Sequence, residues 1–265
     1  MRIFSEFLFC RRCAIIFLPV LIFSVTVFVF RILDSSKVSH TEQESTDDFS
    51  ELSVDEPELD SSYEVLVTVS KFPNLVNILD LDNTFIVDLK YATADNFTGI
   101  VLYDDIDAAY LHPEVAQMLV EAHRYLKELH PDSGFRFIVY DAARPLSVQQ
   151  LMWERVKDTP YHRYVAHPDR RSLHNFAAAV DLTIANRSGV PLDMGTIFDH
   201  FGRAAGINNE EELVRQGILT RQHIQNRELL RKVMRHAGFR TISGEWWHFN
   251  ACSLQEAMQR YELIE

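Results

Sequence analysis

An apolar run near the N-terminus is followed directly by a polar, acidic stretch. Residues 14–30 (AIIFLPVLIFSVTVFVF) contain no charged side chain, and Arg2, Arg11 and Arg12 precede them. This layout is typical of a bacterial export signal or a membrane anchor. Because the run ends in bulky residues and no small-residue cleavage site follows, we expect residues 1–33 to form an uncleaved anchor with its N-terminus inside. Cleavage by a signal peptidase is the alternative.

The stretch at residues 34–62 is rich in Ser, Asp and Glu and poor in large apolar side chains. Ten acidic residues lie between Asp34 and Asp60, against Lys37 as the basic residue. Such a segment buries too little apolar surface to offset the loss of chain entropy on folding. We therefore expect it to be a flexible acidic linker.

Residues 63–265 have the pattern of one globular domain. Apolar positions with the period of an amphipathic helix occur at Val115, Leu119, Ala122 and Leu126. Similar patterns predict helices at 112–130, 145–156 and 226–236, strands at 135–140 and 177–184, and a β-rich segment at 239–250. Helices and short strands alternate without a clear βαβ rhythm, so we expect an α+β fold with a small, mostly antiparallel sheet flanked by helices. The histidines on the predicted helices are expected at surface or boundary positions: His112, His123, His130 and His236.

Composition narrows the classes of function. The formal net charge of -12 argues against a nucleic-acid partner, since phosphate binding needs clustered Lys and Arg. Cys10 and Cys13 lie beside the apolar run, which leaves Cys252 as the cysteine of the globular part. The domain is therefore expected to be stable without an internal disulfide.

Two short clusters in the globular part carry candidate chemistry. Ser172-Leu-His174 is followed by Asp181, and Glu245-Trp-Trp-His248 comes near the C-terminus. Two imidazoles and a carboxylate can hold a catalytic zinc ion and leave a position for water, and the second carboxylate can accept the proton of that water. Other transition ions also suit this ligand set. Each signal alone is weak, because a lone histidine or aspartate more often has a structural role.

The spacing within these clusters predicts local irregularity. Seven residues along a helix rise roughly 10 Å, too far for His174 and Asp181 to bind one ion, and a flat strand separates them further. The chain must therefore bend between them. Glu245 and His248 are three apart, which in a regular strand places them on opposite faces, so we expect a bulge or a strand end there.

Four motifs resemble those of a known family. Residues 172–183 (SLHNFAAAVDLT) are similar to the S-x-H-x-x-G-x-A-x-D signature of zinc D,D-peptidases, and residues 245–248 resemble their E-x-x-H motif. Residues 90–99 (KYATADNFTG) and 140–145 (YDAARP) are similar to the D-alanyl-D-alanine dipeptidases, the group that includes the vancomycin-resistance dipeptidases. The resemblance extends in consistent order from Val87 to Phe249.

This resemblance implies a role for each motif residue. It implies one zinc ion per chain, with His174, Asp181 and His248 as its ligands. It implies that Glu245 is the general base and that Arg144 stabilises the tetrahedral transition state, roles that suit a carboxylate and a cation. Tyr91 and Ser172 match positions that help to hold the termini of the substrate.

The chain departs from the signature at one position, where Ala177 stands in place of glycine. If that glycine normally adopts a positive φ, alanine strains or shifts the bend at a cost of about 1 kcal/mol.

The expected activity is hydrolysis of D-Ala-D-Ala or a closely similar D,D-dipeptide. The expected location is the inner membrane facing the periplasm, or the periplasm itself after cleavage. One alternative is a D,D-carboxypeptidase or endopeptidase acting on peptidoglycan stems, which needs an open groove. Another is a zinc-stabilised cell-wall binding module without catalysis, for which Glu245 and Arg144 would have no use.

Overall fold

The computed structural model describes residues 71–265. The expected anchor at 1–33 and the expected linker at 34–62 lie outside the described residues. Within residues 71–265, no helix combines the length and the apolar character that a membrane span requires.

The centre of the domain is a five-stranded sheet with the strand order β2-β4-β5-β7-β6. Strand β2 runs parallel to β4, and the other neighbours pair in antiparallel fashion. The strands of this sheet are β2 (Ile86–Val87), β4 (Arg136–Asp141), β5 (Ala179–Ala185), β6 (Arg240–Thr241) and β7 (His248–Asn250). A second sheet pairs β1 (Val76–Asn77) with β3 (Tyr110–Leu111).

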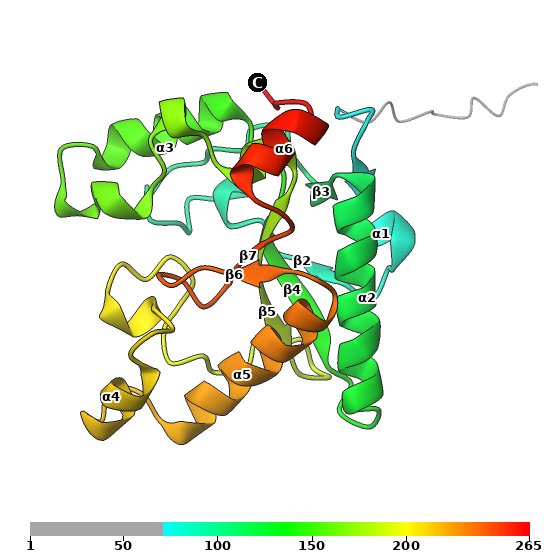
Figure 1. Ribbon diagram of the computed structural model, residues 1–265, viewed down its shortest axis with the longest axis vertical. Coiled ribbons are helices and arrows are strands. Elements are labelled where there is room, and N and C mark those ends of the chain that lie inside the picture. Colours follow the sequence, from blue (N-terminus) through cyan, green and yellow to red (C-terminus); the bar gives the residue numbers. More distant parts are fainter. Residues whose placement is uncertain (1–70) are drawn as a thin grey trace, which may run out of the picture. The chain divides into compact units, whose positions relative to one another are not determined.

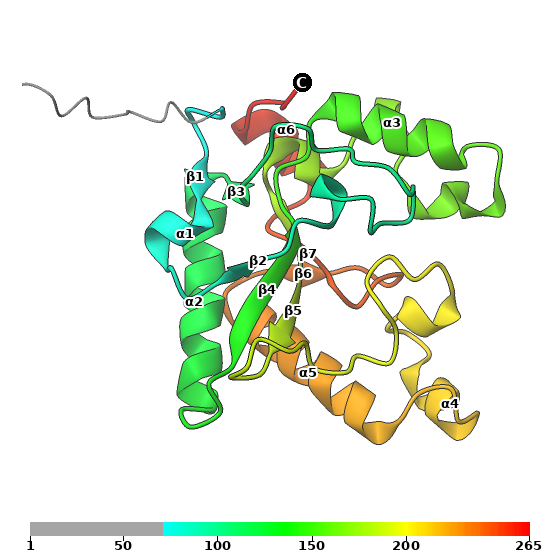
Figure 2. The same ribbon diagram turned by 180° about the vertical axis from the view of Figure 1, so that it is seen from behind.

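Helices cover the sheet mainly on one side. The α-helices are α1 (Ile78–Leu81), α2 (Pro113–Leu129), α3 (Leu146–Val156), α4 (Glu210–Arg215), α5 (Arg221–His236) and α6 (Leu254–Arg260). Helices α2 and α5 pack against each other and against the sheet, while α3 and α4 project on the side away from α2 (Figures 1 and 2). Short 3-10 helices in the described part of the chain are η1 (Lys90–Ala92), η2 (Pro160–Tyr164), η3 (Pro168–Arg170), η4 (Leu173–Phe176) and η5 (Arg203–Ala205).

The alternation of side chains along β5 separates the helix-covered core from the functional face. Val180, Leu182 and Ile184 are fully buried in the main hydrophobic core. Asp181 and Thr183 point to the opposite face, where each lines a cavity. Because successive side chains of a strand point to opposite faces, a single strand supplies both core packing and polar groups for a site.

The expected α+β class and the small, mostly antiparallel sheet are confirmed. The predicted helix at 226–236 begins five residues earlier, at Arg221. The Thr220 side chain caps this helix by accepting a hydrogen bond from the backbone N–H of His223, and a histidine at that position does not belong to the usual Ser/Thr-x-x-Glu capping signature. The true start was therefore not evident from sequence.

The expected surface or boundary position of His123 is wrong. This residue is fully buried on α2, where its ring stacks on Phe85 at 4.4 Å and on Phe137 at 5.1 Å between centroids. It lies one helical turn after Leu119, on the stripe of α2 that faces the core. Its Nδ1 lies 3.0 Å from the Asp82 carboxylate, which provides a polar partner inside the apolar surroundings.

Burial of His123 is expected to make stability depend on pH. Burial lowers the pKa of His123 to about 4, below the usual value of about 6.5 in an unfolded chain. Between these values the unfolded chain binds a proton that the native state does not, so the free energy of unfolding falls as pH falls, by about 3 kcal/mol in total. Urea unfolding from pH 7 to pH 4 should show this slope, and His123→Gln should flatten it.

The exposed His130 at the end of the same helix provides the control. His130→Gln is expected to keep the slope of the wild-type chain. A slope that survives in His123→Gln would mean that another group causes the pH dependence.

Candidate metal centre and active site

Strand register aligns the polar residues of the site across the sheet. Asp181 on β5 lies opposite His248, the first residue of β7. On its other side, Asp181 lies opposite Asp141 at the end of β4, where an irregularity after Val139 shifts the register. A bulge of this kind redirects side chains locally. Three neighbouring strands thus bring Asp141, Asp181 and His248 into one row.

The bend expected between His174 and Asp181 is confirmed. His174 lies on η4, and Ser172 caps the start of this helix: its Oγ accepts a hydrogen bond from the His174 backbone N–H at 3.3 Å. The chain then turns through Ala177, which has left-handed backbone angles (φ 49°, ψ 34°), and enters β5 at Ala179. The chain bends at this residue, and the His174 side chain lies beside Asp181.

The backbone at Ala177 explains why the signature has glycine there. Left-handed angles cost a residue with a Cβ atom on the order of 1 kcal/mol, and a β-branched residue considerably more. Ala177 is fully buried, so a larger side chain must also displace its neighbours. We expect Ala177→Val to lower the free energy of unfolding by about 2–4 kcal/mol.

Ala177→Gly is the matched control for this substitution. It relieves the backbone strain but removes one buried methyl group worth about 0.8 kcal/mol, so its effect should stay within about 1 kcal/mol of zero. Chemical denaturation of the three chains provides the measurement. A valine variant as stable as wild type would show that this turn tolerates a β-branched residue.

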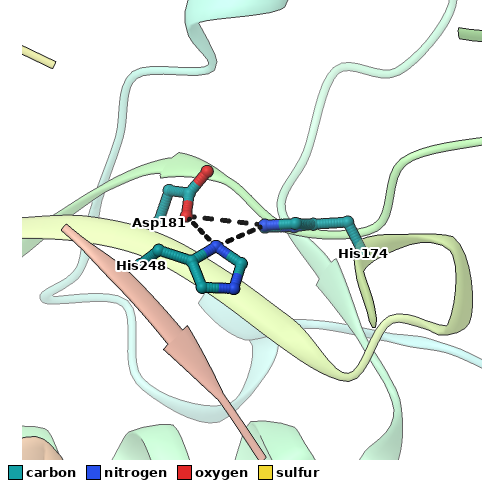
Figure 3. A group of neighbouring side chains, drawn as sticks. All are labelled: His174, Asp181 and His248. Atoms are coloured by element: carbon teal, nitrogen blue, oxygen red, sulfur yellow. Dashed lines mark hydrogen bonds and ion pairs between the residues drawn. The ribbon is translucent and has the colours of Figure 1, made fainter. Parts of the chain in front are cut away.

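His174, Asp181 and His248 form a compact group with the dimensions of a metal site (Figure 3). The Nε2 of His174 lies 3.4 Å from Asp181 Oδ1 and 3.2 Å from His248 Nδ1. The Nδ1 of His248 lies 2.9 Å from Asp181 Oδ1. Bonds of 2.0–2.1 Å in tetrahedral geometry place ligand atoms roughly 3.3 Å apart, so these separations fit a zinc-sized ion.

Hydrogen bonds donated by the outer nitrogen atoms orient both imidazoles. The Nδ1–H of His174 donates to the Ala142 carbonyl at 2.7 Å, which leaves Nε2 with its lone pair directed at the group. The Nε2–H of His248 donates to Asn250 Oδ1 at 2.7 Å, which leaves Nδ1 in the same situation. Such outer partners are characteristic of metal-binding histidines. Two lone pairs and one carboxylate oxygen therefore converge on a point that suits a cation.

Electrostatics at this group also favours a cation. Burial opposes ionisation of Asp181, but His174 and His248 outweigh this effect and hold its pKa below the usual range. Burial lowers the pKa of His248, but Asp181 outweighs it and raises the pKa to about 9. A metal ion at this point would therefore replace a proton.

Glu245 lies in the loop that leads into β7, so the strand end expected between Glu245 and His248 is confirmed. Its Oε2 lies 4.0 Å from His248 Nδ1. Burial and the neighbouring Asp181 raise the pKa of Glu245, although His248 acts in the opposite direction. A carboxylate with a raised pKa is a better proton acceptor than an ordinary surface glutamate.

Arg144 is buried at 8% exposure and held by two acceptors. Its Nε donates to Asp141 Oδ2 at 3.0 Å, its Nη2 donates to the same oxygen, and its Nη1 donates to Gln149 Oε1 at 2.9 Å. Its Nη2 also lies 4.0 Å from Asp181 Oδ2. Burial opposes the charge, but Asp141 keeps the pKa of Arg144 well above the usual value, so the guanidinium is a fixed cation.

Tyr91 and Asp199 form a pair at the same site. The Tyr91 hydroxyl donates to both Asp199 oxygens, at 3.0 and 3.2 Å. The Arg144 guanidinium lies 5.2 Å from the centre of the Tyr91 ring. Asp199 lines the cavity that contains the metal ligands. Burial and Asp181 raise the pKa of Asp199 well above its usual value.

One cavity of about 290 Å³ unites the site. All seven residues predicted from sequence line it: Tyr91, Arg144, Ser172, His174, Asp181, Glu245 and His248. Small-molecule sites commonly measure roughly 300–1,000 Å³, so this cavity suits a small ligand. A neighbouring cavity of about 700 Å³ shares Phe97 and Asp199 with it.

Comparison with known proteins points to the same chemistry. The model of a peptidase family described as D-ala-D-ala dipeptidase matches residues 73–262. The chain is 33% identical to the D-alanyl-D-alanine dipeptidase of Escherichia coli strain K12 over 163 residues, which cover 62% of this chain and 77% of that protein. It is 30% identical to the protein of that name from Synechocystis over 171 residues, covering 53% and 68% of the two chains. It is 28% identical to the one from Enterococcus faecium over 179 residues, covering 61% and 83%.

Proposed function

Since this chain belongs to the D-ala-D-ala dipeptidase family and is a metallopeptidase, we propose that it hydrolyses D-Ala-D-Ala to two molecules of D-alanine. The observation that carries this proposal is the meeting of three metal-binding side chains, the half-buried carboxylate of Glu245 and a buried arginine around one small cavity. This set of groups suits hydrolysis of a peptide bond.

His174, Asp181 and His248 would hold a single zinc ion. When bound, zinc would polarise the peptide carbonyl and make water a stronger acid, to a pKa of about 7. The three side chains leave room for water or substrate, as in catalytic rather than structural zinc sites. The hydrogen bonds that the imidazoles donate to Ala142 and Asn250 keep both rings in the orientation that this requires.

Glu245 would carry the proton. As water attacks the peptide carbonyl carbon, the carboxylate takes one proton from that water, and it then gives the proton to the leaving nitrogen as the C–N bond breaks. The products are one D-alanine with a new carboxylate and one with a free amine. The raised pKa of Glu245 suits both the uptake and the release of the proton.

Arg144 would stabilise the negative charge that develops on the carbonyl oxygen. A cation fixed before the reaction needs no reorganisation when charge develops, which is the main requirement of such a group. Asp141 and Gln149 provide this fixation by holding three nitrogen atoms of the guanidinium. We assign these two residues to positioning, since both act through Arg144.

Tyr91, Asp199 and Ser172 would hold the ends of the dipeptide. Asp199 is a half-buried carboxyl group with a raised pKa, a state that a bound ammonium group would relieve. The Tyr91 hydroxyl orients this carboxylate. The Ser172 oxygen accepts a backbone hydrogen bond, so its O–H is available to a substrate oxygen.

The size of the cavity favours a dipeptide over a peptidoglycan stem. About 290 Å³ is small for a peptide groove. Aromatic rings line part of its wall: Phe201 stacks on Tyr164 at 4.9 Å and meets Phe97 in an edge contact at 5.0 Å between centroids. A binding module would have no need for Glu245 or for the fixed Arg144.

Release of D-alanine from D-Ala-D-Ala by the full chain tests this proposal. Cleavage with zinc, its loss after chelation and its return on adding zinc are expected. A pentapeptide stem in a parallel reaction is expected to remain uncut. Cleavage of the stem would favour the carboxypeptidase or endopeptidase alternative, and cleavage of neither substrate would favour the binding module.

We also propose that the chain acts outside the cytoplasmic membrane, either anchored by residues 1–33 or released after cleavage. The uncharged run at 14–30 and the arginines before it support this location. Recovery of the expressed protein in the membrane or periplasmic fraction is expected, and recovery in the cytosol would refute the proposal.

A further inference from the structure

Arg171 has a backbone conformation that is almost restricted to glycine. Its φ is 61° and its ψ is 168°. Positive φ combined with fully extended ψ brings a Cβ atom too close to the backbone, and residues held there against such strain concentrate at functional sites. Arg171 lies between η3 and Ser172, directly before the short helix that carries His174.

Arg171 is half-buried and lines the catalytic cavity. Across residues 71–265, we find no hydrogen bond or ion pair that engages its guanidinium. The other arginine of the cavity, Arg144, differs in this respect, because Asp141 and Gln149 already occupy three of its nitrogen atoms. Two arginines therefore line the cavity: the guanidinium of Arg144 is already committed, and that of Arg171 has no partner among residues 71–265.

From this contrast we propose that Arg171 binds the C-terminal carboxylate of the substrate and makes the enzyme selective for peptides that end in a free carboxylate. The inference rests on the proposed dipeptidase function. A guanidinium presents paired N–H donors that match the two oxygens of a carboxylate. The ammonium end of a dipeptide would lie at the acidic Asp199, so the two charged ends would have separate partners in one cavity.

This role differs from that of Arg144 in its expected kinetics. A carboxylate that does not react has the same charge in the substrate and in the transition state, so its binding partner affects KM rather than kcat. Arg144 would instead act on charge that appears only in the transition state. Arg171 is thus a specificity-determining residue, and it takes no part in proton transfer.

The test compares D-Ala-D-Ala with D-alanyl-D-alaninamide, which lacks the terminal negative charge. Steady-state release of D-alanine is measured with zinc for the full wild-type chain, Arg171→Met, Arg171→Gly and Arg170→Met. For Arg171→Met we expect kcat/KM on the dipeptide to fall roughly tenfold to a hundredfold, mostly through KM. Its kcat/KM on the amide should change little, so the preference of the wild-type enzyme for the acid should largely disappear.

Two controls separate the guanidinium from the backbone. Arg171→Gly removes the strain, so it should melt at a temperature at least as high as wild type and still lose the preference for the acid. The neighbouring Arg170 is exposed and does not line the cavity, so Arg170→Met should keep the wild-type preference.

Three results would overturn the inference while the dipeptidase function stands: an unchanged acid-over-amide preference in Arg171→Met, an equal loss on both substrates, or a preference retained in Arg171→Gly. A wild-type chain that cleaves neither compound would overturn the proposed function, and this inference with it.

Discussion

Glu245→Gln should lower kcat for D-Ala-D-Ala by about 10³-fold or more, at the upper part of the roughly 10²–10⁴-fold range for loss of a general base. Glutamine has nearly the same shape but cannot accept the proton of the attacking water. Glu245 contributes no ligand to the group formed by His174, Asp181 and His248. Zinc content and melting temperature should therefore remain at wild-type values, as measured by elemental analysis and thermal unfolding.

Glu228 on the exposed side of α5 provides a control for the chemical change itself. Glu228→Gln should have wild-type activity. If Glu245→Gln instead lost zinc or failed to fold, Glu245 would be a structural residue and the binding-module alternative would gain support.

Two buried aspartates that lie opposite each other in the sheet should respond differently to the same substitution. Asp181→Asn removes the anionic metal ligand, so zinc content and activity should both fall by more than about tenfold, in line with the loss of a full ligand rather than of an outer partner. Asp141→Asn leaves all three ligands in place but weakens the hold on Arg144. Zinc content should stay near one ion per chain. The value of kcat should fall by roughly 10²-fold, the size of effect expected when a group that stabilises transition-state charge, here Arg144, is no longer held in place.

Parallel measurement of zinc content and kcat in the two variants provides the comparison. Loss of zinc in Asp141→Asn would show that this residue supports the metal directly, which its 3.5 Å separation from His174 Nδ1 makes a meaningful alternative. Retention of both zinc and activity in Asp181→Asn would remove Asp181 from the site.

The residues that meet at the site could be predicted because they lie in short motifs. Physical spacing also predicted the bend before Asp181 and the strand end before His248, since regular elements cannot bring those pairs together. The roles of Asp141 and Asn250 could not be derived in the same way. Their contacts arise from hydrogen bonds between paired strands and loops, which become visible only when the register is known.

The remaining differences between the sequence predictions and the structure occur at residues with unusual surroundings. Periodicity places His123 on the core-facing stripe of α2, but its residue type suggested the surface. Asp199 had no motif to mark it, and its position in the cavity depends on a loop with irregular backbone, where Asp199 itself has a φ of 58°. Arg171 also has positive φ, a property that an isolated arginine in a sequence does not reveal.

The alignment of Asp181 with its neighbours on β4 and β7 has a consequence for how this protein can misfold. A slip of one residue along β5 would turn Asp181 toward the helices and bring Val180 or Leu182 to the functional face. Such a chain could retain most of its secondary structure and still lack the third ligand. The zinc-to-protein ratio after refolding would then measure the fraction of molecules in which β5 has the native register. Circular dichroism alone could not measure this fraction.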